Sequence, residues 1–205
     1  MLGTQDLAVF VVAGLLLNVT PGPDTLYIVG RSSTQGLRAG VAAALGVGAG
    51  ILVHISAAAV GLSALFAASA TAFTVLKLAG AAYLVYVGIS LMHTSAAGVP
   101  VLQAAGLRAV FIQGFWTNVL NPKVALFFLA FLPQFVDPAT AHKTLALLFL
   151  GLVFNVNGTL WNVFVAWSAA HVGRALVPGR AGAWFNRAVG AIFVVLGVRL
   201  ALYRN

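Results

Sequence analysis

The chain has 205 residues, of which 61% are hydrophobic and only 7% are charged, and its mean hydropathy is +1.04. Soluble domains carry about 25% charged residues, and so few charges would leave large apolar patches in water. This composition excludes a soluble protein and predicts a single transmembrane domain over residues 1–205.

The net charge of +8 comes from eleven Lys and Arg residues against three acids. On a soluble protein this balance would favour nucleic acid, but here the basic residues are spread between long apolar runs, which is typical of membrane topology. Cysteine is absent, which excludes disulfides and thiolate metal sites. The glycine-rich stretch Gly46–Gly50 lacks the Lys-Ser/Thr ending of a nucleotide site and predicts close helix packing. We therefore expect no cofactor, no metal and no nucleic-acid partner.

Six apolar segments predict an all-α membrane protein with six transmembrane helices, each of which needs about 20 residues to cross the bilayer. They lie at about residues 7–30, 40–66, 74–92, 109–135, 144–170 and 188–203. Polar residues break the first segment at Asn18–Asp24 and the fourth at Asn121–Lys123. The stretches 93–108 and 171–187 hold Pro, Gly and polar residues, which predicts loops.

The basic residues also predict the orientation. The loops after the first, third and fifth spans hold six arginines, which are Arg31, Arg38, Arg108, Arg174, Arg180 and Arg187. The opposite side holds Lys143 and Arg204, with Lys77 and Arg199 near span ends. Because cytoplasmic loops carry an excess of Lys and Arg, we expect both termini outside the cytoplasm.

Two sequence patterns recur in the same order in both halves of the chain. The segment Asn18–Asp24 is repeated at Asn118–Lys123, and Lys77–Tyr83 is repeated at Arg187–Phe193. The offsets predict two halves of three helices each, at about 1–95 and 105–205. Because three is an odd number, the second half must enter the membrane from the opposite side. In such inverted repeats, helices broken at corresponding places mark a substrate site near the bilayer midplane.

The two breaks contain the residues that we expect to form this site, which are Asn18, Pro21, Gly22, Pro23, Asp24, Asn118, Asn121, Pro122 and Lys123. Proline removes a backbone donor, so each break frees polar backbone groups that must face protein or a wet cavity. Glycine between two prolines allows a ligand to approach the main chain closely.

The charges in the breaks match an amino acid, which is a zwitterion. Asp24 suits the ammonium, whereas Lys123, Asn121 and the amide ends of the half-helices suit the carboxylate. A charge at membrane depth costs about 2.5–3.5 kcal/mol, so it should have a partner. In the empty site we expect Asp24 and Lys123 to pair with each other.

Structural roles stay open for the same residues. Asp24 could be the N-cap of the following half-helix, and Lys123 could extend to a lipid headgroup. His54 joins Asp24 as a candidate proton relay, although a lone His in a membrane more often bonds to a neighbouring helix. Asn155 is a weaker candidate for lining the cavity, because Asn residues within spans usually join helices.

At the two breaks the sequence resembles the LysE-type amino-acid exporters, in particular the homoserine/threonine efflux (RhtB) branch. The matching stretches are Thr20–Tyr27, Arg31–Ser32, Gln35–Gly40, Asn118–Lys123 and Ala125–Phe135. The resemblance implies a multi-pass transporter of the bacterial inner membrane. It implies export of small amino acids or derivatives, homoserine-, threonine- or leucine-like, by proton antiport. It specifies neither the cargo nor an oligomeric state.

The alternative function is an ion channel or a metal-ion exporter of similar topology. Such proteins need rings of acids or His/Asp clusters, and the two acids besides Asp24 both lie in flanking segments. An intramembrane enzyme would need a nucleophile with its base, and Asp24 and His54 have no recognisable spacing. We therefore predict a secondary transporter and no enzyme, with Asp24 as the group that carries the coupling proton.

Overall fold

The computed structural model describes residues 3–68, 70–93, 102–137, 139–172 and 180–202. Within these ranges the chain is helical and contains no strand. The elements in chain order are α1 (Leu7–Val19), α2 (Pro23–Gln35), α3 (Leu37–Ala68), α4 (Ala70–His93), α5 (Leu107–Val119), α6 (Pro122–Ala130), the 3-10 helix η1 (Leu132–Phe135), α7 (Lys143–Val172) and α8 (Arg180–Leu202).

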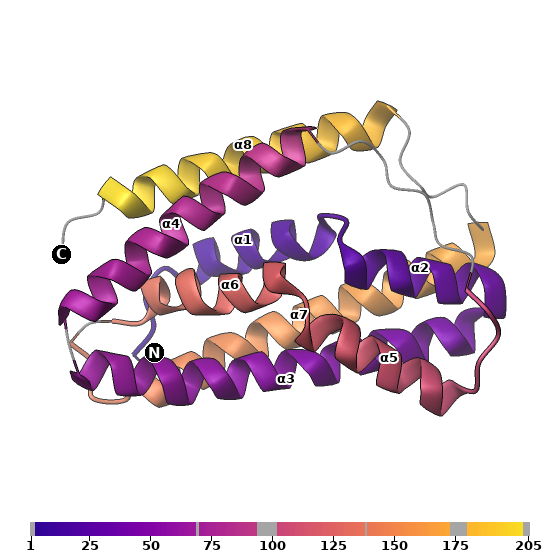
Figure 1. Cartoon of the computed structure of the whole chain (residues 1–205), viewed down its shortest axis with the longest axis horizontal. Helices are drawn as coiled ribbons and strands as arrows, with labels where there is room; N and C mark the ends of the chain where they lie inside the picture. Colours follow the sequence, from indigo (N-terminus) through magenta and orange to yellow (C-terminus); the bar gives the residue numbers. More distant parts are fainter. Residues whose placement is uncertain (1–2, 69, 94–101, 138, 173–179, 203–205) are drawn as a thin grey trace.

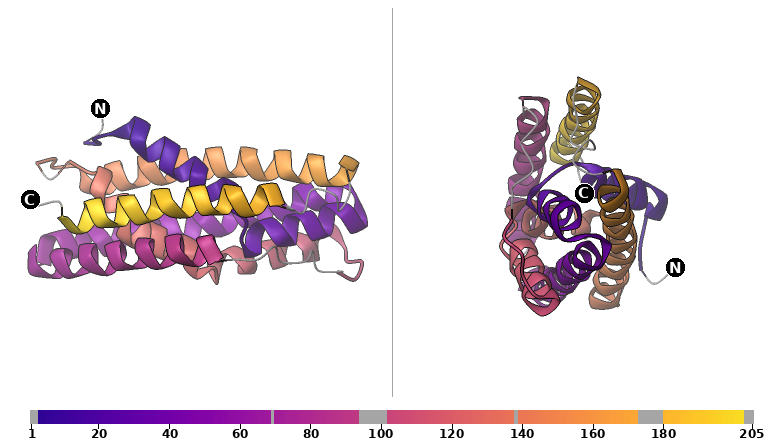
Figure 2. Two further views of the ribbon diagram at one scale, coloured as in Figure 1. Left: turned by 90° about the horizontal axis from the view of Figure 1, so that it is seen from above. Right: turned by 90° about the vertical axis from the view of Figure 1, so that its right-hand side faces the viewer.

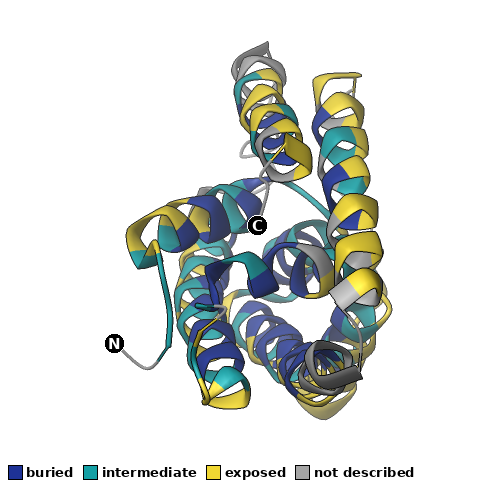
Figure 3. Cartoon of the chain, turned by 90° about the vertical axis from the view of Figure 1, so that its left-hand side faces the viewer, coloured by how far each residue is buried: buried dark blue, intermediate teal, exposed yellow. Residues whose placement is uncertain are grey.

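The helices run along the long axis of an elongated bundle (Figures 1 and 2). The central helix α3 packs against α5 on one side and against α7 on another, and α2 also contacts both α3 and α7. Helices α4 and α8 lie side by side and contact mainly each other, with α4 joining the rest of the bundle through α6 and α3. Buried residues concentrate where α1, α3, α6 and α7 meet (Figure 3).

Both predicted breaks are confirmed as bends between short helices. The pair α1 and α2 bends by 53°, and the pair α5 and α6, continued by η1, bends by 51°. Pro23 and Pro122 are the first residues of α2 and α6, a position where the missing N–H costs nothing. The bends place the ends of four half-helices in the middle of the bundle.

The chain is an all-helical, multi-span membrane protein. Helices α3 and α7 are each long and apolar enough to cross a membrane, and each bent pair passes the same test when its two helices are taken together, as a broken span or a re-entrant loop. In α4 and α8 the apolar stretches are shorter, at 78–90 and 187–198. The six-span inverted repeat stays a prediction. The loop expected at 171–187 was too long, because helix α8 already begins at Arg180. The rest of that loop, 173–179 with Arg174, lies outside the described residues.

Small residues bring α3 and α5 close together. A Cβ atom at Gly114 would lie 2.6 Å from the Ala43 carbonyl oxygen, and one at Gly50 would lie 2.7 Å from the Phe115 carbonyl oxygen. The predicted close packing of the glycine-rich stretch is therefore confirmed. Gly36 ends α2 with φ of +80°, a conformation that favours glycine, and α3 starts at the next residue.

The half of the bundle that holds α1, α6 and η1 is packed with aromatic rings. Phe127 lies 4.9 Å from Phe154 of α7 and 5.0 Å from Phe131, measured between ring centroids. Phe10 of α1 contacts Phe135 at 5.2 Å. This aromatic cluster (Phe10, Phe127, Phe128, Phe131, Phe135 and Phe154) forms a dry core on one side of the two breaks.

Candidate functional site

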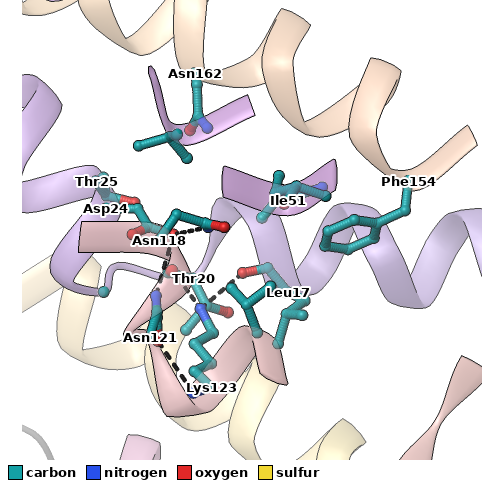
Figure 4. A pocket seen from close by; sticks show the side chains of 14 residues that line it. Leu17, Thr20, Asp24, Thr25, Ile51, Asn118, Asn121, Lys123, Phe154 and Asn162 are labelled. Atoms are coloured by element: carbon teal, nitrogen blue, oxygen red, sulfur yellow. Dashed lines mark hydrogen bonds between the residues drawn. The ribbon is translucent and has the colours of Figure 1, made fainter. Parts of the chain in front are cut away.

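A polar cavity of about 30 Å³ lies where the two breaks meet (Figure 4). Its polar lining consists of Asn18, Thr20, Asp24, Thr25, Asn118, Asn121, Lys123 and Asn162, and its apolar walls include Ile51 of α3 and Phe154 of α7. This volume holds about two water molecules. The site is therefore contracted in this conformation.

Asp24 stands in the first turn of α2 and points toward α5 across the cavity. Its Oδ2 accepts hydrogen bonds from Asn118 Nδ2 at 2.8 Å and from Asn121 Nδ2 at 3.1 Å. Among the described residues, Asp24 Oδ1 and Asn118 Oδ1 are buried and have no hydrogen-bond partner. Two acceptor oxygens thus remain available inside the cavity for a ligand that can donate.

Lys123 supplies the hydrogen bond that Pro21 removes from α1. The Leu17 carbonyl would accept from the amide of residue 21 in a continuous helix, but proline has no N–H. The Lys123 ammonium donates instead, to the carbonyls of Leu17 and Thr20, each at 2.9 Å. Cations are favoured at the C-terminal end of a helix, so the α1 dipole also stabilises this contact.

His54 of α3 contacts the backbone at the second break. Pro122 has no N–H to donate to the Asn118 carbonyl, which accepts instead from the Asn121 amide at 2.9 Å. His54 Nε2 lies 3.0 Å from this carbonyl oxygen, and its ring stacks on Phe128. His54 therefore contacts the backbone of α5, and the Asn118 side chain lies between it and Asp24. Among the described residues, no hydrogen bond joins Asp24 to His54 directly.

The remaining predicted residues shape or line the cavity. Asn121 caps α6, since its Oδ1 accepts from the Lys123 amide at 3.0 Å. Gly22 lies beside the Lys123 ammonium, because a Cβ atom there would be 3.7 Å from Nζ. Asn18 lines the cavity, whereas Asn155 accepts from Thr159 at 3.2 Å and is replaced in the lining by Asn162.

Three interpretations that the sequence left open for the two charges are wrong. Asp24 does not cap α2, because the N-cap is Gly22 and no side chain fills that role. Lys123 does not extend to a headgroup but turns inward to α1. No ion pair joins the two within the described residues, since amides hold the carboxylate and backbone carbonyls hold the ammonium.

Comparison with known proteins decides the family. The model of the LysE type translocator family matches residues 15–204. The chain belongs to this family. As a LysE-type translocator it is a membrane transporter and not an enzyme, and within the described residues no cluster of three or more His, Cys, Asp or Glu side chains is placed to hold a metal ion.

Several relatives cover the translocator almost completely. An uncharacterized membrane protein of Pseudomonas aeruginosa is 31% identical over 98% of this chain and 96% of its own length. The homoserine/homoserine lactone efflux protein of Salmonella typhimurium is 30% identical over 96% of both chains. The leucine efflux protein of the same organism is 25% identical over 99% of this chain and 98% of its own. No solved structure matches the translocator significantly.

Sequence reasoning missed how the translocator stabilises its breaks. The signal was present, because a proline stands four residues after Leu17 and after Asn118 and cannot donate to either carbonyl. It did not reveal which side chains contact these carbonyls, since Lys123 and His54 come from positions far away in the chain.

Proposed function

We propose that this translocator exports small neutral amino acids or their derivatives, homoserine-, threonine- or leucine-like, from the cytoplasm. One observation carries the proposal: a buried carboxylate and a buried ammonium line the same cavity without pairing with each other. Two unpaired charges of opposite sign match the two charged groups of a zwitterion. The Salmonella relatives, whose names refer to homoserine and leucine efflux, support the same substrate class.

The ammonium of the amino acid binds at Asp24. Asp24 Oδ1 and Asn118 Oδ1 are buried acceptors without a partner among the described residues, and an ammonium has three N–H groups to donate. Hydrogen bonds to a charged group contribute about 1.5–3 kcal/mol, more than bonds between neutral groups. Asn118 and Asn121 hold the other carboxylate oxygen and so fix the direction of the acceptor.

The carboxylate of the amino acid binds between Lys123 and the first break. Lys123 uses two of its three N–H donors on the α1 carbonyls, which leaves one for the substrate. Asn18 Nδ2 is a second buried donor without a partner within the described part of the chain. Gly22 leaves the N-terminal end of α2 open to close approach, and helix N-termini favour anions.

The cavity must widen to hold any amino acid. About 30 Å³ is smaller than even the smallest amino acid, so this conformation is a contracted one. The breaks allow widening, because α2 and α6 can tilt about Pro21–Gly22 and Asn121–Pro122 relative to α1 and α5. Alternating access then follows from moving half-helices around a fixed polar centre.

Proton entry drives the export, with Asp24 as the coupling group. Moving one charge through 100 mV is worth about 2.3 kcal/mol, and a tenfold gradient is worth about 1.4 kcal/mol. One proton per neutral amino acid therefore sustains a gradient of roughly fifty-fold. Asp24 is the acid in the cavity, and protonation would release a bound ammonium. Asp6 and Asp137 flank the helices instead.

Counterflow in liposomes tests this function. The full chain is reconstituted, and exchange of radiolabelled homoserine, threonine and leucine is measured with and without a pH gradient. We expect saturable exchange of at least one of them, driven uphill by the gradient. Asp24→Asn should raise the half-saturating concentration about 10- to 100-fold, the loss expected for one charge-assisted hydrogen bond. pH-driven accumulation should be lost.

The matched control is Asp6→Asn. Asp6 is exposed before α1 and has φ of 50°, which asparagine readily adopts, so exchange should be unchanged. The proposal fails if the wild type exchanges no amino acid. If Asp24→Asn keeps pH-driven exchange, only the coupling role of Asp24 fails.

A further inference from the structure

A polar seam joins α2 to α5 on the side of the cavity opposite the aromatic cluster. Tyr27 donates to the Val110 carbonyl at 2.8 Å and to Gln113 Oε1 at 3.2 Å. One turn further along α2, Arg31 bonds to the same Gln113 side chain. At the end of the helix, Gln35 Nε2 donates to the Ala105 carbonyl at 2.9 Å. The seam therefore continues from Asp24 to the end of the bundle.

Arg31 is the centre of this seam and is buried, with only 4% of its surface exposed. Its guanidinium donates to Tyr27 OH at 3.3 Å, to Gln35 Oε1 at 2.6 Å, to the Gln103 carbonyl at 2.7 Å and to Gln113 Oε1 at 2.5 Å. Every one of these acceptors is neutral. The guanidinium thus fastens α2 both to α5 and to the segment that precedes α5.

Among the described residues, no carboxylate balances the charge of Arg31. The chain has three acids, and Asp24 is already held by two asparagines. Asp6 precedes α1 and Asp137 follows η1, at the opposite end of the bundle, where Thr4 pairs with Val136. Charge-assisted hydrogen bonds are about twice as strong as neutral ones, so a carboxylate would displace the neutral acceptors.

The position of Arg31 connects it to the transport site. Residues 24, 27 and 31 lie on one face of α2, and Arg31 is about 10 Å along the helix from Asp24. This end of the bundle also carries the exposed Arg38 and Arg108, so the positive-inside rule makes it the cytoplasmic end. A solute leaving the cytoplasm meets Arg31 before it meets Asp24.

We propose that Arg31 is a second carboxylate-binding site, which binds the cargo on the cytoplasmic side. In the absence of cargo, its hydrogen bonds hold α2 and α5 together along the seam. The inference rests on the proposed function. The cargo carboxylate takes the place of Gln103 and Gln113 on the guanidinium, and this exchange separates α5 from α2. The ammonium end of the cargo then reaches Asp24 through the opened seam. During this exchange, the aromatic cluster keeps the side of the cavity opposite the seam closed.

Competition between an amino acid and its amide tests this site. The amide keeps the ammonium and loses the carboxylate. Unlabelled leucine and leucinamide, or threonine and threoninamide, compete with whichever labelled amino acid the wild type exchanges. In Arg31→Gln we expect the half-inhibitory concentration of the acid to rise about tenfold, the difference between charge-assisted and neutral hydrogen bonds, while that of the amide is unchanged. Arg31→Lys should restore part of the acid preference, because it keeps the charge.

A second variant strengthens the contact between Arg31 and α5 instead of removing it. Gln113→Glu gives Arg31 a permanent carboxylate partner, which should hold the seam closed and lower the maximal exchange rate about tenfold. The control is Arg38→Gln, which removes an exposed arginine from the same end of the bundle. It should leave both the inhibition by acid and amide and the maximal exchange rate unchanged. All variants are first checked for a single peak in gel filtration.

If Arg31→Gln weakens inhibition by the amino acid and by its amide equally, Arg31 has only a structural role and the proposal is overturned. The proposal is also overturned if Gln113→Glu exchanges substrate at the wild-type maximal rate. An effect of Arg31→Gln that appears only in liposomes with anionic lipid would assign the guanidinium to a lipid phosphate instead. If the wild type exchanges no amino acid at all, the proposed function fails first; if it does, only the Arg31 site is at stake.

Discussion

Replacing Lys123 with methionine tests whether the lysine substitutes for the amide that Pro21 lacks. The change keeps an unbranched side chain one atom shorter than lysine and removes both hydrogen bonds to α1. Each buried carbonyl left without a donor costs about 1–3 kcal/mol, and the loss of a buried ammonium offsets part of this. We expect a net loss of about 2 kcal/mol, which corresponds to about 4–8 °C in the unfolding midpoint of a chain of this size.

The sharper measurement is a double-mutant cycle with Pro21→Ala. Alanine restores an N–H at position 21, which can donate to the Leu17 carbonyl when Lys123 is absent. Lys123→Met should therefore cost about 1 kcal/mol less in the Pro21→Ala background than in the wild type. The midpoints are measured by tryptophan fluorescence of the detergent-purified protein during heating.

An equal loss in both backgrounds would refute this account of the break, because Lys123 would then not replace the missing amide. Arg108→Met is the control for removing a basic residue at an exposed position, and it should leave the midpoint unchanged.

Three further predictions concern glycines and His54. Gly36→Ala should destabilise the protein by about 1–3 kcal/mol because φ is +80°, whereas Gly106→Ala, with φ of −63° and open space around it, should change the midpoint little. Gly114→Ala should cost about 1–3 kcal/mol of stability, because the new Cβ meets a backbone carbonyl of α3 at 2.6 Å. Gly61→Ala meets nothing within 4 Å and should be neutral or slightly stabilising. Heating curves in which Gly61→Ala unfolds at the lower temperature of the two would contradict this packing. His54→Gln keeps a donor for the carbonyl at the end of α5, so exchange should retain its pH dependence; loss of that dependence in counterflow would make His54 a proton carrier.

The sequence predicted the features that depend on local chemistry. A proline kinks or breaks a continuous helix in its interior, so Pro21–Pro23 and Pro122 located both bends without any tertiary information. Composition alone required lipid as the solvent, and the motif around the breaks identified the family that the comparison confirms. The glycine-rich stretch of α3 predicted close packing because a helix without side chains on one face can approach its neighbour.

The partners of the charged residues could be decided only by the tertiary structure. Sequence reasoning paired Asp24 with Lys123, since opposite charges at membrane depth attract. In the folded bundle the nearer partners are amides for Asp24 and the orphaned carbonyls of α1 for Lys123. Likewise, nothing local shows that Arg31 is buried among neutral acceptors, because Gln103 and Gln113 reach it from another part of the chain.

A sequence determines where backbone hydrogen bonds must fail, because proline lacks its donor in every context. Which side chain then replaces the lost donor depends on the distances between helices that are remote in the chain, and those distances are set by packing. For this translocator, the amino acids alone determined a membrane bundle with two broken helices. The fold decided that Lys123 replaces the missing donor at the first break and that His54 contacts the second.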